Sequence, residues 1–139
     1  IDAPPGTGDE PLTVAKTIPD AYALIVTTPQ EVSLIDFKKS IRFCQKTKMR
    51  ILGIVENMAY FTPSELPDNK YYIFGKEGGR RLAEENQIPF LGEVPLVKSV
   101  ADAGDNGFPI VLDSEDTIGE AYRNIAGRVA QELSILANR

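Results

Sequence analysis

The apolar run ILGIV at residues 51–55 decides the fold class of this chain, and the polar residues Glu56 and Asn57 follow it directly. Two similar runs flank it along the sequence, AYALIVT at 21–27 and FLGEV at 90–94. A short run that is apolar throughout predicts a strand buried on both faces, as in a parallel sheet that helices cover on each side.

Helical patterns alternate with these runs. Thr28 has the features of an N-cap, Pro29 suits the first helical position, and Glu31 stands three residues after the cap as in a capping box. The apolar face of the predicted helix then consists of Leu34, Phe37, Ile41 and Cys44. Such alternation of strands and helices predicts an α/β domain with a mainly parallel sheet.

Three more helices are predicted: over 76–85, with Leu82 and Ala83 facing inward, over 97–103, and from Thr117 onward. In the last helix, Thr117 and Glu120 form a second capping box, and the helix should cover one face of the sheet. A long irregular stretch is expected over 59–70, with short extended segments over 71–74 and 109–112. The apolar positions of the last helix are Ile118, Tyr122, Ile125, Val129, Leu133 and Leu136.

The composition excludes several classes of function. There is no histidine, which removes histidine-based general bases, Ser-His triads and ordinary zinc sites. The net charge is −5 and no basic stripe or long apolar run occurs, so we expect neither nucleic acid nor a membrane as a partner. A single cysteine, Cys44, is typical of a protein in a reducing cytoplasm.

The stretch IDAPPGTGD at residues 1–9 has two interpretations. A carboxylate such as Asp2 at the end of a strand, followed by a loop with Gly6, can hold Mg²⁺ beside a nucleotide phosphate. Proline and glycine clusters are also ordinary surface turns. Because no strand precedes the carboxylate, we expect that the chain lacks an N-terminal part.

A phosphate-binding loop of the pattern G-x-x-x-x-G-K-[ST] does not occur in the sequence, nor does the dinucleotide pattern G-x-G-x-x-G. FGKEGG at residues 74–79 is the nearest approximation. It could hold an anion at the N-terminus of the predicted helix, or it could be a structural glycine turn, which we favour.

Several motifs together resemble a known family. DAPPGTGDEPLT, VTTPQEVSLIDFKKSI, ILGIVENMAYF, YIFGKEGGRRLAEE, PFLGEVPL and DNGFPIV occur in this order. They are similar to the C-terminal portion of Mrp-type ATPases, the iron–sulfur cluster carriers in the MinD/ParA-like branch of P-loop ATPases. The resemblance implies that residues 1–139 form one domain, the C-terminal part of a P-loop NTPase fold without the Walker A segment.

The resemblance also implies roles for the opening stretch. Asp2 corresponds to the Walker B-type aspartate, which holds Mg²⁺ through its water shell. Pro5 and Gly6 belong to the segment PPGTG that senses the γ-phosphate of ATP, so Asp2 and Gly6 are the implied catalytic residues.

On the adenine side, Asn57 in the motif VENM resembles the asparagine that hydrogen-bonds the base, and its amide offers both a donor and an acceptor. Pro95 and Leu96 resemble the segment that lines the adenine pocket. Taken without the resemblance, Asn57 reads as an ordinary turn residue at the end of a strand.

The sequence departs from the family at one place. Members commonly carry C-x-x-C in the loop after NMxYF, where two subunits bind a bridging cluster through thiolates. Here the loop is TPSELPDNK at 62–70, and its Glu65 and Asp68 are poor substitutes for thiolates. Cys44 lies on the apolar face of a predicted helix, so we identify no iron–sulfur ligand.

Three functions therefore stand as hypotheses. The first is a homodimeric Mg²⁺-ATPase that carries an iron–sulfur cluster to apoproteins, with little or no hydrolysis by this chain alone. The second is an ATP-gated scaffold that binds no cluster. The third is an unrelated flavodoxin-like or receiver domain, which would not explain a chain that starts at the end of a strand.

Overall fold

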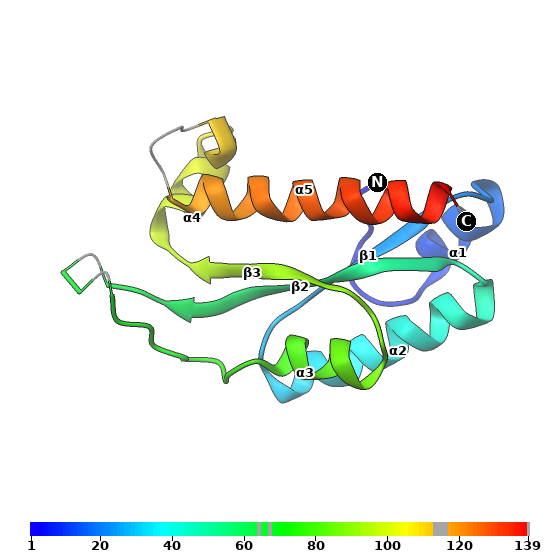
Figure 1. Cartoon of the computed structure of the whole chain (residues 1–139), viewed down its shortest axis with the longest axis horizontal. Helices are drawn as coiled ribbons and strands as arrows, with labels where there is room; N and C mark the ends of the chain where they lie inside the picture. The colour runs from blue at the N-terminus through cyan, green and yellow to red at the C-terminus, as the bar shows by residue number, and fades with distance from the viewer. Residues whose placement is uncertain (64, 67, 113–116, 139) are drawn as a thin grey trace.

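The computed structural model describes residues 1–63, 65–66, 68–112 and 117–138, and it places a parallel sheet between two layers of helices (Figure 1). The strands are β1 (Tyr22–Thr27), β2 (Arg50–Phe61) and β3 (Phe90–Leu96). The helices are α1 (Asp9–Thr17), α2 (Glu31–Thr47), α3 (Gly78–Glu85), α4 (Lys98–Asp105), α5 (Thr117–Ala137) and the 3-10 helix η1 (Ile110–Leu112).

The strand β2, which contains the run ILGIV, is the centre of the sheet. The described strands pair in the order β1-β2-β3, and both pairings are parallel. Neighbouring residues of β2 face opposite layers, since Ile54 packs with α2 and α3 while Val55 packs with α5. The prediction of a parallel sheet with a central strand buried on both faces is confirmed.

Two apolar clusters hold the layers to the sheet, and Figure 1 shows α2 and α3 on one side of it and α5 on the other. The predicted inward faces of α2 and α3 are correct, and α5 covers β2 and β3 as expected. The cluster under α2 and α3 consists of Ile25, Leu34, Phe37, Ile41, Ile54, Leu82 and Ala83. The cluster under α5 consists of Val55, Leu91, Val94 and Ile125.

Glycine at position 53 lets β3 approach β2 closely. A Cβ atom at Gly53 would lie 2.5 Å from Cγ of Leu91 and 2.8 Å from the carbonyl oxygen of Pro89. Because both contacts are shorter than van der Waals distance and one involves backbone, a side chain here would push the strands apart.

The edge strand β1 is less buried than its sequence predicts. Leu24 and Val26 are 43% and 60% exposed, whereas Ile25 on the other face is buried. The reason is that α5 packs on β3 and β2, so it leaves this face of β1 uncovered. The expectation of a strand buried on both faces is therefore wrong for 21–27.

Several element boundaries also differ from the predictions. The strand β2 continues to Phe61, so the irregular stretch is shorter than 59–70, and Tyr71 bridges back to Phe61. Residues 110–112 form a 3-10 turn rather than an extended segment. The short helix α1 was not predicted, because the proline and glycine residues before it suggest only a turn, and it buries none of its side chains.

The start of α2 shows why the first capping box is absent. The helix begins at Glu31 after Gln30, and the Thr28 hydroxyl is hydrogen-bonded to that of Ser33 at 2.6 Å instead of capping a backbone N–H. Pro29 is buried, and its carbonyl oxygen lies against Gly78 of α3. The second predicted capping box depends on the side chain of Thr117, which lies outside the described residues. Among the described helices, none combines the length and the apolar character needed to cross a membrane.

We expect Gly53→Ala to destabilise the chain by about 1–3 kcal/mol, since the added methyl group overlaps Leu91 and the Pro89 carbonyl. Urea unfolding monitored by circular dichroism measures the effect. The matched control is Gly127→Ala on the exposed side of α5, where a Cβ meets nothing within 4 Å. That substitution should stabilise the chain by about 0.5–1 kcal/mol, and equal effects of the two would contradict the close approach of the strands.

Candidate functional site

The carboxyl ends of the parallel strands form one edge of the sheet, and part of the predicted site lies there. Asn57 on β2 pairs with Val94 on β3, so Pro95 follows one position along the adjacent strand. Pro95 is buried and Leu96 is half-buried. The structure therefore brings the three residues predicted to contact adenine to neighbouring positions at the edge where open α/β sheets bind ligands.

The backbone of β2 bends immediately after Asn57. Met58 has a φ of 53°, a left-handed conformation that is uncommon outside glycine, and the register with β3 is irregular between Asn57 and Phe61. The N–H of Met58 donates to Oδ1 of Asn57 at 2.9 Å. This local bond holds the carboxamide at the bend, while its NH₂ group stays available as a donor, because Asn57 is only partly buried.

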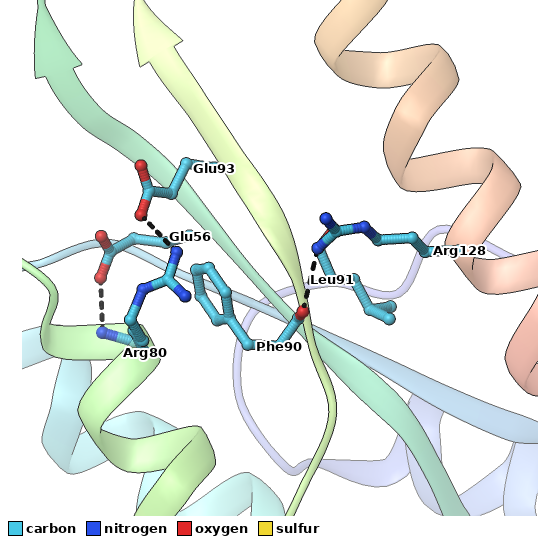
Figure 2. A network of polar contacts seen from close by, with 7 residues as sticks. Glu56, Arg80, Phe90, Leu91, Glu93 and Arg128 are labelled. Carbon is cyan, nitrogen blue, oxygen red and sulfur yellow. Dashed lines mark hydrogen bonds and ion pairs between the residues drawn. The ribbon is translucent and has the colours of Figure 1, made fainter.

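Glu56, one residue earlier in β2, is buried on the opposite face of the strand, against α3. It is 1% exposed, and its carboxylate accepts a hydrogen bond from the N–H of Gly79 in the first turn of α3 (Figure 2). A Cβ atom at Gly79 would lie 3.0 Å from both Oε2 of Glu56 and Cγ2 of Thr27. The last glycine of FGKEGG, Gly79, is therefore required for the close approach of α3 to Thr27 of β1 and Glu56 of β2.

Arg80 and Glu93 extend this contact to β3. The Arg80 guanidinium donates to Oε1 of Glu93 at 3.2 Å and lies 4.4 Å from the centre of the Phe90 ring (Figure 2). On the α5 side, Arg128 donates to the main-chain oxygens of Leu91 at 3.3 Å and Phe90 at 3.5 Å. Helices on both faces are thus tied to β3 by arginine.

The pKa of Glu56 is shifted by its surroundings. Burial raises the pKa above its ordinary value, the hydrogen bond from Gly79 lowers it in part, and the negative charges of Glu93 and Glu77 raise it. The positive charge of Arg80 lowers it, but Arg80 bonds to Glu93 rather than to Glu56. Loss of solvation is the largest cause, so the neutral acid is favoured relative to a carboxyl group in water.

The glycine motif 74–79 is a structural turn whose helix end receives an anion from the chain itself. Gly75 has a φ of 109°, and a Cβ at Gly78 would lie 2.9 Å from the carbonyl oxygen of Pro29. The carboxylate of Glu56 occupies the N-terminal turn of α3, where helix dipoles favour negative charge. Of the two interpretations of this motif, the structural one agrees with the geometry.

The opening stretch lies apart from the adenine-side residues. Residues 1–8 form neither helix nor strand, and Asp2, Pro5 and Gly6 are exposed. Gly6 has a φ of 98° with open space around it, which is typical of a turn. In Figure 1 the N-terminus lies away from the arrowheads of β2 and β3 along the long axis of the molecule. The roles of Asp2, Pro5 and Gly6 stay predictions.

The loop that departs from the family is held by aromatic and cationic side chains. Phe61 and Tyr71 exchange two backbone hydrogen bonds of 2.8 Å. The ammonium group of Lys70 lies 3.9 Å from the centre of the Tyr60 ring, which meets the Tyr72 ring edge-on at 6.3 Å. These contacts stabilise the described part of the connection between β2 and α3.

The single cysteine is not placed to bind a cluster. Cys44 is 4% exposed on the sheet-facing side of α2, and burial raises the pKa of its thiol, which disfavours the thiolate form that ligates iron. Within the part of the chain that the structure describes, no three Cys, His, Asp or Glu residues are grouped so that they could hold a metal ion.

A separate cavity of about 430 Å³ lies beside α4 and the start of α5. Its lining is apolar, and none of the predicted site residues contributes to the lining described. The residues around it are Val100, Ala103, Gly104, Gly107, Phe108, Pro109, Ile110, Val111 and Tyr122.

Sequence reasoning missed the contact between Glu56 and the start of α3. The only local signal was a carboxylate directly after an apolar run, which reads equally as the polar end of a strand. Its partner Gly79 lies 23 residues away, so the pairing depends on the packing of α3 against β2.

Comparison with known proteins places the chain in a family. A family model described as "ParA: NUBPL iron-transfer P-loop NTPase" matches residues 1–130. An iron–sulfur cluster carrier protein of Synechocystis is 44% identical over 138 residues, covering 99% of this chain and 39% of that protein. One from Saccharolobus solfataricus is 46% identical over 132 residues, covering 93% of this chain and 44% of that protein.

Solved structures agree with this assignment. A nucleotide-binding protein of Archaeoglobus fulgidus in complex with ADP has a TM-score of 0.68 and 41% identity, covering 77% of this chain and 44% of that one. The cell division protein MinD of Aquifex aeolicus, at 19% identity and a TM-score of 0.63, shares the fold over 88% of this chain and 48% of its own. The chain spans less than half the length of these relatives. The match over residues 1–130 and these likenesses show that the chain belongs to the ParA/NUBPL family of iron-transfer P-loop NTPases.

Proposed function

We propose that this chain forms the adenine-side portion of the ATP site in a P-loop ATPase that carries iron–sulfur clusters. The main support is that Asn57 and Pro95 lie at neighbouring positions of adjacent strands, at the edge of the sheet toward which the carboxyl ends of the strands point. The backbone bend at Met58 lies beside them. A protein 41% identical to this chain has been solved in complex with ADP, which supports nucleotide binding as the function. In this proposal, residues 1–139 are the C-terminal portion of one ATPase domain.

Each residue of the edge has a defined task in this proposal. The carboxamide of Asn57 would donate to a ring nitrogen of adenine and accept from its amino group, which distinguishes adenine from other bases. Pro95 and Leu96 would contact the face of the base, since their side chains are apolar and lie at the end of β3. Adenine recognition then needs no movement of the strands, because the local bond to Met58 already holds Asn57.

The phosphate side of the site rests on the opening stretch. Asp2 would hold the water shell of Mg²⁺, the ion that neutralises phosphate charge during transfer, and Gly6 would allow close approach of the γ-phosphate. The sequence has no lysine in a phosphate-binding loop, so we propose that residues outside this chain grip the phosphates. The intact protein would then be a cytoplasmic homodimer that hydrolyses ATP and delivers clusters to apoproteins.

A scaffold that binds no cluster is the second candidate, and a specific observation favours it. The sequence holds one cysteine and no histidine, and that cysteine is buried. A protein of this kind would use its ATP cycle to gate the assembly of partners and would bind no cluster.

We expect ADP binding to be weak in this chain and to depend on Asn57. Asn57→Ala should raise the dissociation constant by about tenfold, because one donor and one acceptor toward the base are lost. Isothermal titration with Mg-ADP measures this change, and a steady-state assay should find no ATP turnover by the chain alone. Asn124→Ala on the exposed side of α5 is the control and should bind as the native chain does. Equal affinities of the native and Asn57→Ala chains would remove Asn57 from the site.

Anaerobic reconstitution with ferrous iron and sulfide tests whether this chain itself contains ligands for a cluster. This chain should acquire no stoichiometric visible absorbance, since Cys44 is buried and its thiol pKa is raised. A cluster that forms in the native chain and is lost in Cys44→Ser would contradict this placement. In a longer form of the protein that includes the preceding sequence, a stoichiometric cluster would support the carrier over the scaffold.

A further inference from the structure

Each of the three strands, or the segment that follows it, has a contact with the first turn of α3. The N–H of Gly79 donates to Glu56 on β2, and Gly78 lies against the Pro29 carbonyl that follows β1. The third connection runs from Arg80 to Glu93 on β3. The long connection that leaves β2 after Phe61 therefore runs back along the sheet, so that α3 packs against β2 at Glu56, before the end of the strand (Figure 1).

Burying the carboxyl group of Glu56 costs solvation free energy, so the group is an unusual choice for holding a helix in place. Among the described residues, Glu56 forms no ion pair, since the nearby Arg80 pairs with Glu93, and its hydrogen-bond partner is a single backbone N–H. The charged groups that face it are Glu77 and Arg80 from the start of α3 and Glu93 from β3, while β1 presents the uncharged Thr27. Buried ionisable groups of this kind are enriched where a protein positions functional residues.

Glu56 and Asn57 are consecutive residues of β2 whose side chains point to opposite faces. This follows from the alternation along a strand, because Ile54 faces α3 and Val55 faces α5. Immediately after them, the backbone enters the left-handed conformation at Met58. Anchoring the Glu56 side chain therefore fixes the rotation of the strand at the point where Asn57 and the bend are presented.

We propose that Glu56 is a positioning residue for Asn57: its hydrogen bond to Gly79 fixes the pleat of β2 and so sets the direction in which the Asn57 carboxamide faces the ligand edge. The proposal rests on the proposed function only in taking Asn57 as the adenine-binding residue. The positional coupling between Glu56 and Asn57 can be measured with no nucleotide present.

Amide NMR of the full chain tests the coupling. The amide resonance of Gly79 should titrate with Glu56, with a midpoint above the ordinary glutamate pKa because burial raises it, and the Met58 amide and Asn57 side-chain NH₂ resonances should move with the same midpoint. Glu56→Gln keeps a carbonyl acceptor for Gly79, so these resonances should stay near their native positions but lose the titration. Glu56→Ala should displace all three sets.

The matched control is Glu93→Gln, which removes the other carboxylate of this cluster; the coupled titration of Gly79, Met58 and Asn57 should persist, with a lower midpoint because the negative charge that raises the Glu56 pKa is gone. A Gly79 titration without any movement at Asn57 and Met58 would overturn the proposal. So would native positions of the Asn57 and Met58 resonances in Glu56→Ala. If Glu56→Ala does not fold, the comparison of the native chain with Glu56→Gln decides the outcome.

A second experiment, nucleotide binding, distinguishes a failure of this proposal from a failure of the proposed function. In Mg-ADP titrations, Glu56→Ala should weaken binding several-fold and Glu56→Gln should restore it, because the acceptor for Gly79 returns. If neither the native chain nor any variant binds ADP, the proposed function is wrong. The NMR result still shows whether Glu56 and Asn57 are coupled. If Asn57→Ala weakens binding and Glu56→Ala does not, the positioning role is wrong and the adenine assignment stands.

The stability of the chain should also depend on pH through Glu56. Because burial raises its pKa in the folded state, the folded chain binds the proton more tightly than the unfolded chain. The contribution to stability is fully present below the ordinary glutamate pKa and is lost as the pH rises through the raised folded value. In urea unfolding, the native chain should lose stability relative to Glu56→Gln as the pH rises over this interval, and a constant difference would contradict the shift.

Discussion

The burial of β2 on both faces is the constraint on which the rest of the structure depends. A central parallel strand has no solvent-exposed side, so each residue of its apolar run must meet a helix layer or a neighbouring strand. Ile54 and Val55 meet the two layers, and Gly53 gives β3 the room to pair. Where the apolar run ends, Glu56 is still buried, and its carboxylate must be satisfied by the helix that packs above it.

The fold was largely predictable because its main signals are local. The apolar runs and the spacing of Leu34, Phe37 and Ile41 determine which side of each element is buried. The exposure of Leu24 and Val26 was not predictable, because the sequence of an edge strand looks the same whether or not a layer covers it. The prediction of an extended segment at residues 109–112 was wrong for a related reason, since a short apolar run fits a 3-10 turn as well as a strand.

The candidate site was predictable in part. Asn57, Pro95 and Leu96 lie just beyond the apolar runs 51–55 and 90–94 of two neighbouring parallel strands, so their proximity follows from the topology. The contact of Glu56 with Gly79 joins residues far apart in sequence and depends on how closely α3 packs. The opening stretch differs again: its motif is specific, but residues 1–8 form no regular element that would bring Asp2 to the edge.

The chain belongs to a family of iron-transfer NTPases, yet its single cysteine is buried. The two facts are compatible if this part of the protein binds the nucleotide. The central claim is therefore that the carboxyl edge of β2 and β3 contacts adenine. Hydrogen–deuterium exchange of the chain with and without saturating ADP tests it most directly. If adenine contacts this edge, exchange should become slower over residues 56–60 and 94–97 when ADP is bound. Protection confined to the apolar cavity at residues 100–111, with no change at Asn57, would contradict it.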